Sequence, residues 1–314
     1  MPQYRDRLPQ LDADLFLTDG GIETTLIFDD GLDLPDFAAF TLLADEEGRS
    51  ALVRYFDRYA DIARRDEVGI VLETPTWRAN PDWAVRQGYA AADLDAANHD
   101  AVDLVMEARA RWEQPGVPVV VSGCIGPRGD GYHPDSIMTA EEAQAYHAVQ
   151  IGTFADTEAD LVTAITMTYA DEAIGITRAA QAEDLPVVIS FTAETDGRLP
   201  TGESLGEAIE AVDAATGSGP AYYMVNCAHP THFIDALEPD AAWTRRIRGV
   251  RANASRQSHA ELDEAEELDS GDPRELAQDY LALASKLPQL AVLGGCCGTT
   301  HEHVSAISRA FTTR

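Results

Sequence analysis

The sequence predicts a single-domain (β/α)8 barrel spanning residues 1–314, and three observations lead to that fold class. Eight short apolar runs alternate with amphipathic stretches along the whole chain. Most of the runs are rich in Val and Ile and nearly continuous in apolar character, as expected of parallel strands buried on both faces. A doubly wound open sheet is the alternative, but no G-x-G-x-x-G motif follows the first run. The count of eight strands also favours a closed barrel.

Helical patterns and helix-capping signals lie between the eight expected strands. Residues Leu52, Phe56 and Tyr59 fall on one face of a helix that would pack against the barrel. The strands are expected in the runs at 15–21, 69–75, 117–127, 159–168, 185–193, 221–230, 246–255 and 290–298. Helix starts are expected at the capping boxes Thr139 with Glu142, Ser204 with Glu207 and Thr299 with Glu302, and at Asp272-Pro273.

The least regular segment is the acid-rich stretch at 258–273, "SHAELDEAEELDSGDP". Runs of like charge usually face water, so we expect a solvated excursion after the seventh strand. A cation site in this segment is the alternative interpretation.

The charge balance is strongly acidic, with 54 Asp plus Glu against 23 Lys plus Arg and a formal net charge of −31. Such a charge repels nucleic-acid phosphates and anionic membrane surfaces, so neither is expected as a partner. A cationic substrate or partner would suit this surface. The favoured interpretation is a solvated, halophile-like surface that keeps the protein soluble in a salt-rich cytoplasm.

The amino-terminal residues show no signal peptide, and no apolar stretch approaches the roughly 18 residues of a membrane span. The four cysteines are therefore expected to be reduced thiols of a cytoplasmic protein. The oligomeric state stays open, and a homo-oligomer is allowed.

Three of the cysteines lie at the ends of expected strands. Cys227 ends the sixth run, and the adjacent Cys296 and Cys297 end the eighth. The carboxyl ends of barrel strands meet at one rim, so these thiols can converge, and three thiolates can hold a zinc ion with one position open. Adjacent cysteines are poor disulfide partners for each other. The alternative is that Cys296 and Cys297 only pack under the barrel mouth.

Other residues could compete with this metal site. The fourth cysteine, Cys124, ends the third run and is interpreted as a small buried residue. Four histidines follow the cysteine-bearing runs and are rival ligands of low priority: His229, His232, His301 and His303.

Several motifs carry a family resemblance. The segments "TDGGIETTL" at Thr18–Leu26, "VNC" at Val225–Cys227 and "GGCCGTTHEH" at Gly294–His303 resemble the homocysteine S-methyltransferase family, and the likeness covers essentially the whole chain. That family uses betaine, S-methylmethionine or a methylfolate as methyl donor. The resemblance implies a zinc-bearing barrel whose three thiolate ligands correspond to Cys227, Cys296 and Cys297.

The chemistry so implied needs a small-molecule thiol acceptor and an onium-type methyl donor. Zinc would lower the pKa of the acceptor thiol, and the sulfur would displace the methyl group in line. Asp19 with Gly20 and Gly21 is expected to hold the amino-acid part of the acceptor, although Asp19 capping the next helix is the alternative. The weaker substrate-binding candidates are Glu23, Glu73 and Asn226. The aromatic residues Trp77, Tyr132 and Tyr169 could box a cationic donor, but ordinary packing is favoured for each.

One departure from the family puts the acceptor in doubt. Family members commonly carry a Glu at the end of the fourth strand that helps to hold the substrate ammonium, whereas Met167 and Thr168 stand at the expected place here. Either Glu73 supplies the missing charge and the acceptor is homocysteine, or the acceptor is a thiol with no ammonium group there.

Three functions follow from these patterns. The first is a zinc-dependent methyltransferase that converts homocysteine to methionine, as in methionine biosynthesis, or acts on another thiol. The second is a non-catalytic zinc-binding barrel, which would not need an intact Asp19-Gly20-Gly21 segment. The third, and weakest, is an enzyme with Cys124 or Cys297 as covalent nucleophile, because no base partner is evident.

Overall fold

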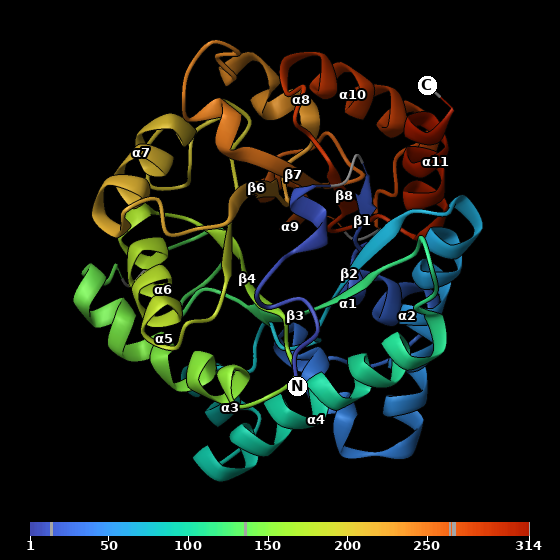
Figure 1. Cartoon of the computed structure of the whole chain (residues 1–314), viewed down its shortest axis with the longest axis vertical. Helices are drawn as coiled ribbons and strands as arrows, with labels where there is room; N and C mark the ends of the chain where they lie inside the picture. The colour runs from blue at the N-terminus through green and yellow to red at the C-terminus, as the bar shows by residue number, and fades with distance from the viewer. Residues whose placement is uncertain (13–14, 135–136, 264, 266–267, 314) are drawn as a thin grey trace.

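Eight parallel strands close into a barrel in the chain order β1 to β8, with β8 pairing back onto β1 (Figure 1). The computed structural model describes residues 1–12, 15–134, 137–263, 265 and 268–313. The strands are β1 Phe16–Leu17, β2 Gly69–Glu73, β3 Val119–Ile125, β4 Leu161–Met167, β5 Val187–Phe191, β6 Tyr222–Asn226, β7 Ile247–Ala252 and β8 Val292–Gly295. Each lies within one of the eight apolar runs, so the predicted (β/α)8 barrel is confirmed.

Helices surround the barrel as an outer ring, and two short ones, α1 Ile22–Thr24 and α9 His259–Asp263, appear inside that ring in the view of Figure 1. The other helices are α2 Glu46–Asp66, α3 Pro81–Arg86, α4 Ala91–Trp112, α5 Ala140–Ala155, α6 Ala170–Ala182, α7 Leu205–Thr216, α8 Pro230–Phe233, α10 Pro273–Lys286 and α11 His301–Thr312. Short 3₁₀ segments lie at Pro9–Leu11, Pro35–Phe37, Ala39–Ala44, Ile234–Ala236 and Thr244–Arg246, and a π turn lies at Thr25–Asp29.

The helix starts follow the predicted caps with one exception. Thr139 and Ser204 form capping boxes with Glu142 and Glu207, and Asp272 caps α10 ahead of Pro273. The box predicted at Thr299 is wrong by one residue, because the N-cap of α11 is Thr300. The Thr299 hydroxyl instead donates to the carbonyl of Cys296 at 2.7 Å, which holds the loop after β8.

The barrel interior changes from apolar to polar along the strands. Near the strand beginnings, one apolar cluster fills the interior with side chains that include Phe16, Val71 and Val120, and Leu8 from the amino-terminal segment packs against them. Side chains alternate along a strand, so the next inward position on β3 is Ser122, whose hydroxyl bonds to Thr163 on β4 at 2.8 Å. The polar groups thus gather toward the carboxyl ends of the strands.

Strand β4 departs from regular pairing near its end. Its register with β5 shifts between Ala164 and Met167, and Thr166 has a φ of 62°, in the left-handed region. An irregularity of this kind breaks the alternation of side chains, so two neighbouring residues can face the same cavity.

The acid-rich segment at 258–273 is not wholly a solvated excursion. It begins with the short helix α9, whose first residue His259 is buried and bonds to the carbonyl of Cys227 at 2.5 Å. Part of the predicted excursion, at 264 and 266–267, lies outside the described residues.

Candidate metal centre

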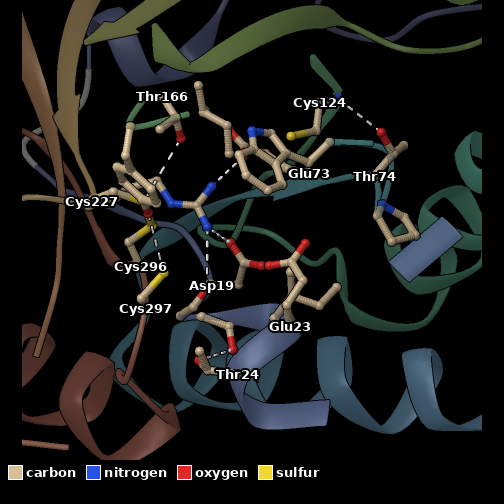
Figure 2. Close-up of a pocket in the computed structure, with 18 residues that line it drawn as sticks. Asp19, Glu23, Thr24, Glu73, Thr74, Cys124, Thr166, Cys227, Cys296 and Cys297 are labelled. Carbon is tan, nitrogen blue, oxygen red and sulfur yellow. Dashed lines mark hydrogen bonds and ion pairs between the residues drawn. A yellow bond between two sulfur atoms is a disulfide. The ribbon is translucent and has the colours of Figure 1, made fainter. Parts of the chain in front are cut away.

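Three cysteine sulfurs converge at the carboxyl ends of β6 and β8. The Sγ atoms of Cys227, Cys296 and Cys297 all lie within 4.8 Å of one another, and Figure 2 shows them grouped on one side of a cavity. Within the described residues, His, Cys, Asp and Glu side chains come close enough to share a metal ion in one group, and that group consists of these three cysteines. The convergence expected at the rim is therefore present.

Backbone contacts fix the cysteine-bearing loops. Cys227 has a φ of 51°, a conformation that costs a non-glycine residue on the order of 1 kcal/mol or more. Its N–H donates to the Arg251 carbonyl at 3.0 Å, and its own carbonyl accepts from Asn253 and His259. On the neighbouring loop, the Cys296 N–H donates to Ala252 at 2.8 Å. Both loops are thus pinned to β7 and the segment after it.

Cys227 and Cys296 are joined as a disulfide, whereas reduced thiols were expected. The adjacent pair Cys296 and Cys297 is not bonded, as predicted. A disulfide needs two sulfurs in direct contact, and a shared metal needs the same sulfurs to converge. The bonded pair is the two-electron oxidised form of two members of the same sulfur cluster.

The donor set fits a thiophilic metal once the cysteines are reduced. Three sulfur ligands satisfy three corners of a tetrahedron and leave the fourth open. Hydroxyl groups lie next to two of the sulfurs: Tyr132 Oη is 3.7 Å from Cys297 Sγ, and Thr166 Oγ1 is 3.9 Å from Cys227 Sγ. Such hydroxyls can donate to thiolates, so they suit deprotonated cysteines.

The rival histidines are engaged elsewhere. His229 contacts Thr231 through Nδ1, His232 contacts the Arg256 carbonyl, and the buried His303 contacts the Ser270 carbonyl, all through ring nitrogens. His301 is exposed in the first turn of α11. His303, by contrast, is buried, with 3% of the residue exposed.

The cavity beside the sulfurs contains most of the predicted substrate-binding residues. Its empty volume is about 580 Å³, including the open mouth. The predicted residues that line it are Asp19, Gly20, Gly21, Glu23 and Glu73, with the three cysteines and Cys124.

Arg251, near the end of β7, occupies the centre of the polar group, and the sequence interpretation missed it. Its Nη2 lies 2.5 Å from Asp19 Oδ1, and its Nη1 donates to Glu73 Oε2. Its Nε donates to the Gly295 carbonyl at 3.1 Å, and Nη2 also reaches the Gly20 carbonyl at 3.3 Å. The signal was an arginine inside the apolar run "GVRANA", at the mouth of the barrel.

Arg251, Asp19 and Glu73 each favour the charged form of their ion-pair partner. Burial alone lowers the pKa of Arg251, but Asp19 and Glu73 outweigh it and raise that pKa above its ordinary value. Burial raises the pKa of both carboxyl groups, while the guanidinium opposes that rise. The guanidinium is therefore permanently charged and pairs with both carboxylates.

Asp19 does not cap the following helix. The N-cap of α1 is Gly21, and the second carboxylate oxygen of Asp19 accepts from the Tyr55 hydroxyl at 2.9 Å. Gly20 is required by close packing, because a Cβ there would lie 2.6 Å from the Tyr59 hydroxyl and 2.8 Å from the Thr299 carbonyl. A Cβ on Gly21 would lie 2.5 Å from the Cys296 carbonyl.

Glu23 and Asn226 differ in their access to the cavity. Glu23 lines it, and burial raises the pKa of its carboxyl to about 7. Asn226 is buried and lies outside the lining. Its amide oxygen accepts from the Thr166 N–H at 2.8 Å and from Ser190 at 2.6 Å, and its Nδ2 donates to Thr166 Oγ1 at 2.9 Å. Asn226 therefore holds Thr166 in its left-handed conformation.

On β4, the residues that face the cavity are Ile165 and Thr166 rather than the predicted Met167 and Thr168. Met167 packs in the core between barrel and helices, and Thr168 is buried outside the lining. The register shift in β4 explains the error. The corrected positions also carry no acid, so the departure from the family pattern stands.

The three aromatic candidates do not form one box. Trp77 and Tyr132 line the cavity, whereas the Tyr169 hydroxyl accepts from the backbone N–H of Met138. The Arg78 guanidinium already stacks on Trp77, 3.9 Å from the ring centroid. Cys124 is buried, and burial together with the nearby Glu73 raises the pKa of its thiol, which argues against a nucleophilic role.

Comparison with known proteins gives a consistent result. A family model described as "Homocysteine S-methyltransferase" matches residues 16–311. A protein named homocysteine S-methyltransferase 1 from Arabidopsis thaliana is 24% identical over 95% of this chain and 94% of its own length, and its namesake from Brassica oleracea var. italica is 23% identical over the same shares.

Solved structures match the fold. The metallated form of the homocysteine methyltransferase MmuM from Escherichia coli superposes with a TM-score of 0.78 at 21% identity, covering 98% of this chain and 99% of that one. Its oxidized form superposes with a TM-score of 0.77 at 21% identity, covering 95% and 96%. No helix in the described part of the chain is long and apolar enough to cross a membrane.

Proposed function

The chain belongs to the homocysteine S-methyltransferase family, and on that premise we propose that it is a zinc-dependent enzyme that moves a methyl group from an onium donor to a small thiol. The observation that carries the proposal is the convergence of Cys227, Cys296 and Cys297 within 4.8 Å at the edge of an open cavity. When bound to these sulfurs, zinc would offer its open position to the acceptor sulfur and lower the pKa of that thiol.

The reaction then needs little further acid–base chemistry from the protein. The acceptor thiol releases its proton to solvent, and its sulfur lone pair forms the new S–C bond. The bond between the methyl carbon and the onium centre breaks, and its electrons stay on the departing neutral amine or sulfide. The residues that line the cavity position the two substrates and limit the access of water.

Homocysteine, the acceptor after which the family is named, is the first candidate. The Asp19-Gly20-Gly21 segment lines the same cavity as the cysteines, which supports a substrate site beside the metal and argues against a mere zinc store. A second candidate, a thiol of another class, is favoured by the pairing of Arg251 with Asp19 and Glu73.

The test uses reduced, zinc-loaded protein with homocysteine and, in turn, S-methylmethionine, betaine and a methylfolate. Methionine formation from one donor, lost in Cys297→Ser, would support the proposal. The matched control is Cys124→Ser, which removes a cavity thiol outside the metal cluster and should retain activity. Zinc binding without methylation of homocysteine or of the amine-free thiol 4-mercaptobutyrate by any donor would favour the non-catalytic alternative.

A further inference from the structure

Two buried carboxylates at the cavity would normally attract a cation. Asp19 and Glu73 are 2% and 4% exposed, and both line the same cavity as the three cysteines. If the acceptor sulfur binds a metal held by the three cysteines, the rest of the acceptor molecule extends into this cavity. An ammonium group a few bonds from the sulfur would therefore be expected to seek these two carboxylates.

The protein already supplies that cation. Arg251 binds Asp19 Oδ1 at 2.5 Å and Glu73 Oε2, and it is itself 4% exposed. The remaining carboxylate oxygen of Asp19 accepts from the Tyr55 hydroxyl. A substrate ammonium would have to displace a bound guanidinium or lie beside it, and two like charges repel strongly in a buried site.

The third acid in the cavity does not replace them. Glu23 lies on α1 and lines the cavity, but burial disfavours its charged form. On β4, the lining residues Ile165 and Thr166 are uncharged. Burial also raises the pKa of Asp19 and Glu73, but the Arg251 guanidinium contacts both groups and opposes that rise. Among the described lining acids, these two are therefore the ones already bound by a cation of the protein.

We infer that Arg251 is a specificity-determining residue that replaces the ammonium group of an amino-acid acceptor, so that the preferred acceptor is a thiol with no ammonium group near Asp19 and Glu73. This inference rests on the proposed function and names its acceptor class. Amine-free thiols, such as mercapto acids and simple alkyl thiols, belong to this class.

The experiment compares four thiols of related length: homocysteine, its des-amino form 4-mercaptobutyrate, its des-carboxy form 3-aminopropane-1-thiol, and propane-1-thiol. Affinity for the reduced, zinc-loaded protein is measured by calorimetry, and kcat/KM is measured with the active donor. The two amine-bearing thiols, each paired with its amine-free partner, isolate the contribution of the ammonium group.

The key variant is the double substitution Arg251→Met with Glu73→Gln. It removes one positive and one negative charge, so the net charge of the group stays the same, while Asp19 becomes available to an ammonium. A control, Arg49→Met, breaks the surface pair of Arg49 with Glu107 and leaves the cavity intact. Arg251→Lys provides a further variant that keeps the cation if the double variant folds poorly.

In the wild type we expect the ammonium group to improve affinity by no more than about threefold, and in the double variant by at least about tenfold. Arg251→Lys should resemble the wild type. An ammonium contribution above threefold in the wild type overturns the inference, even if methylation proceeds. If the binding preferences are as expected but no thiol is methylated, the proposed function fails and the acceptor class stands.

Discussion

Arg251 Nη2 lies 2.5 Å from Asp19 Oδ1, and this contact joins the end of β7 to the residues after β1 across the barrel mouth. Both side chains are almost fully buried. The pair therefore also contributes to stability, because removing one partner leaves a buried charge without its counter-charge.

Arg251→Met should destabilise the fold by about 3–5 kcal/mol, because Asp19 and Glu73 both lose their cation. The double variant with Glu73→Gln should lose less, since one buried carboxylate is gone and Asp19 keeps its bond from Tyr55. Urea denaturation measures both free energies of unfolding. Arg49→Met, at a solvent-exposed pair, should stay within about 1 kcal/mol of the wild type. A single Arg251 variant as stable as that control would contradict the pairing.

The sequence predicted the eight strands because buried parallel strands leave continuous apolar runs, and it placed Cys227, Cys296 and Cys297 on one rim because strand ends in a barrel meet there. These features depend on local composition and on a closed topology. Both predictions therefore hold even where the expected end of a strand is wrong by one or two residues.

The sequence placed Asp19, Glu23 and Glu73 at the cavity but did not predict the β4 residues that face it or the ion pairs of Arg251. The register shift in β4 moved the facing residues to Ile165 and Thr166. Arg251 lies in a run with two other arginines, Arg246 and Arg248, and periodicity alone does not show which of them is neutralised inside the barrel. The ion pairs of Arg251 on β7 with Asp19 after β1 and Glu73 on β2 are long-range contacts that a single sequence does not encode locally.

Asn226→Ala should destabilise the fold by about 2–4 kcal/mol, because the Thr166 N–H and the Ser190 hydroxyl would lose their shared acceptor in a buried site. Zinc content should persist, since Asn226 contributes no metal ligand. Thermal unfolding and metal analysis of the purified variant test the two expectations. A variant of unchanged stability would show that the amide does not hold Thr166.

The melting temperature should rise as potassium chloride increases from low to molar concentrations, because a net charge of −31 repels itself and added ions screen the repulsion. A melting temperature that is flat or falls with salt would show that the halophile-like interpretation of the surface is wrong. The metal site would be unaffected by that result.

Glu23→Gln should change how stability depends on pH. Burial raises the pKa of Glu23 to about 7 in the folded protein from 4.5, so the folded state holds this proton where the unfolded state has lost it. The stabilisation by the protonated form is complete below about pH 4.5 and is lost as pH rises to about 7.

Relative to the wild type, the neutral Gln variant should therefore gain stability across that pH interval, by up to about 3 kcal/mol. Urea denaturation of zinc-free, reduced protein at pH 4, 5.5 and 8 measures the difference between the two proteins. A difference that does not vary with pH would mean that Glu23 titrates normally and is well hydrated in the cavity.

The cysteine cluster gives the most direct test of the metal centre. Reduced protein should bind about one zinc ion per chain, and Cys227→Ser, Cys296→Ser and Cys297→Ser should each abolish stoichiometric binding, because three ligands are needed to hold the ion tightly. Oxidised protein, with Cys227 and Cys296 joined, should bind none, since only one of the three thiolates remains. Reduction should restore binding with release of protons, because the thiols must ionise to coordinate.

Cys124→Ser should bind zinc like the wild type, since Cys124 lines the cavity outside the cluster. Stoichiometric zinc in any one of the three cluster variants, measured by mass spectrometry of the native protein, would remove that cysteine from the metal centre.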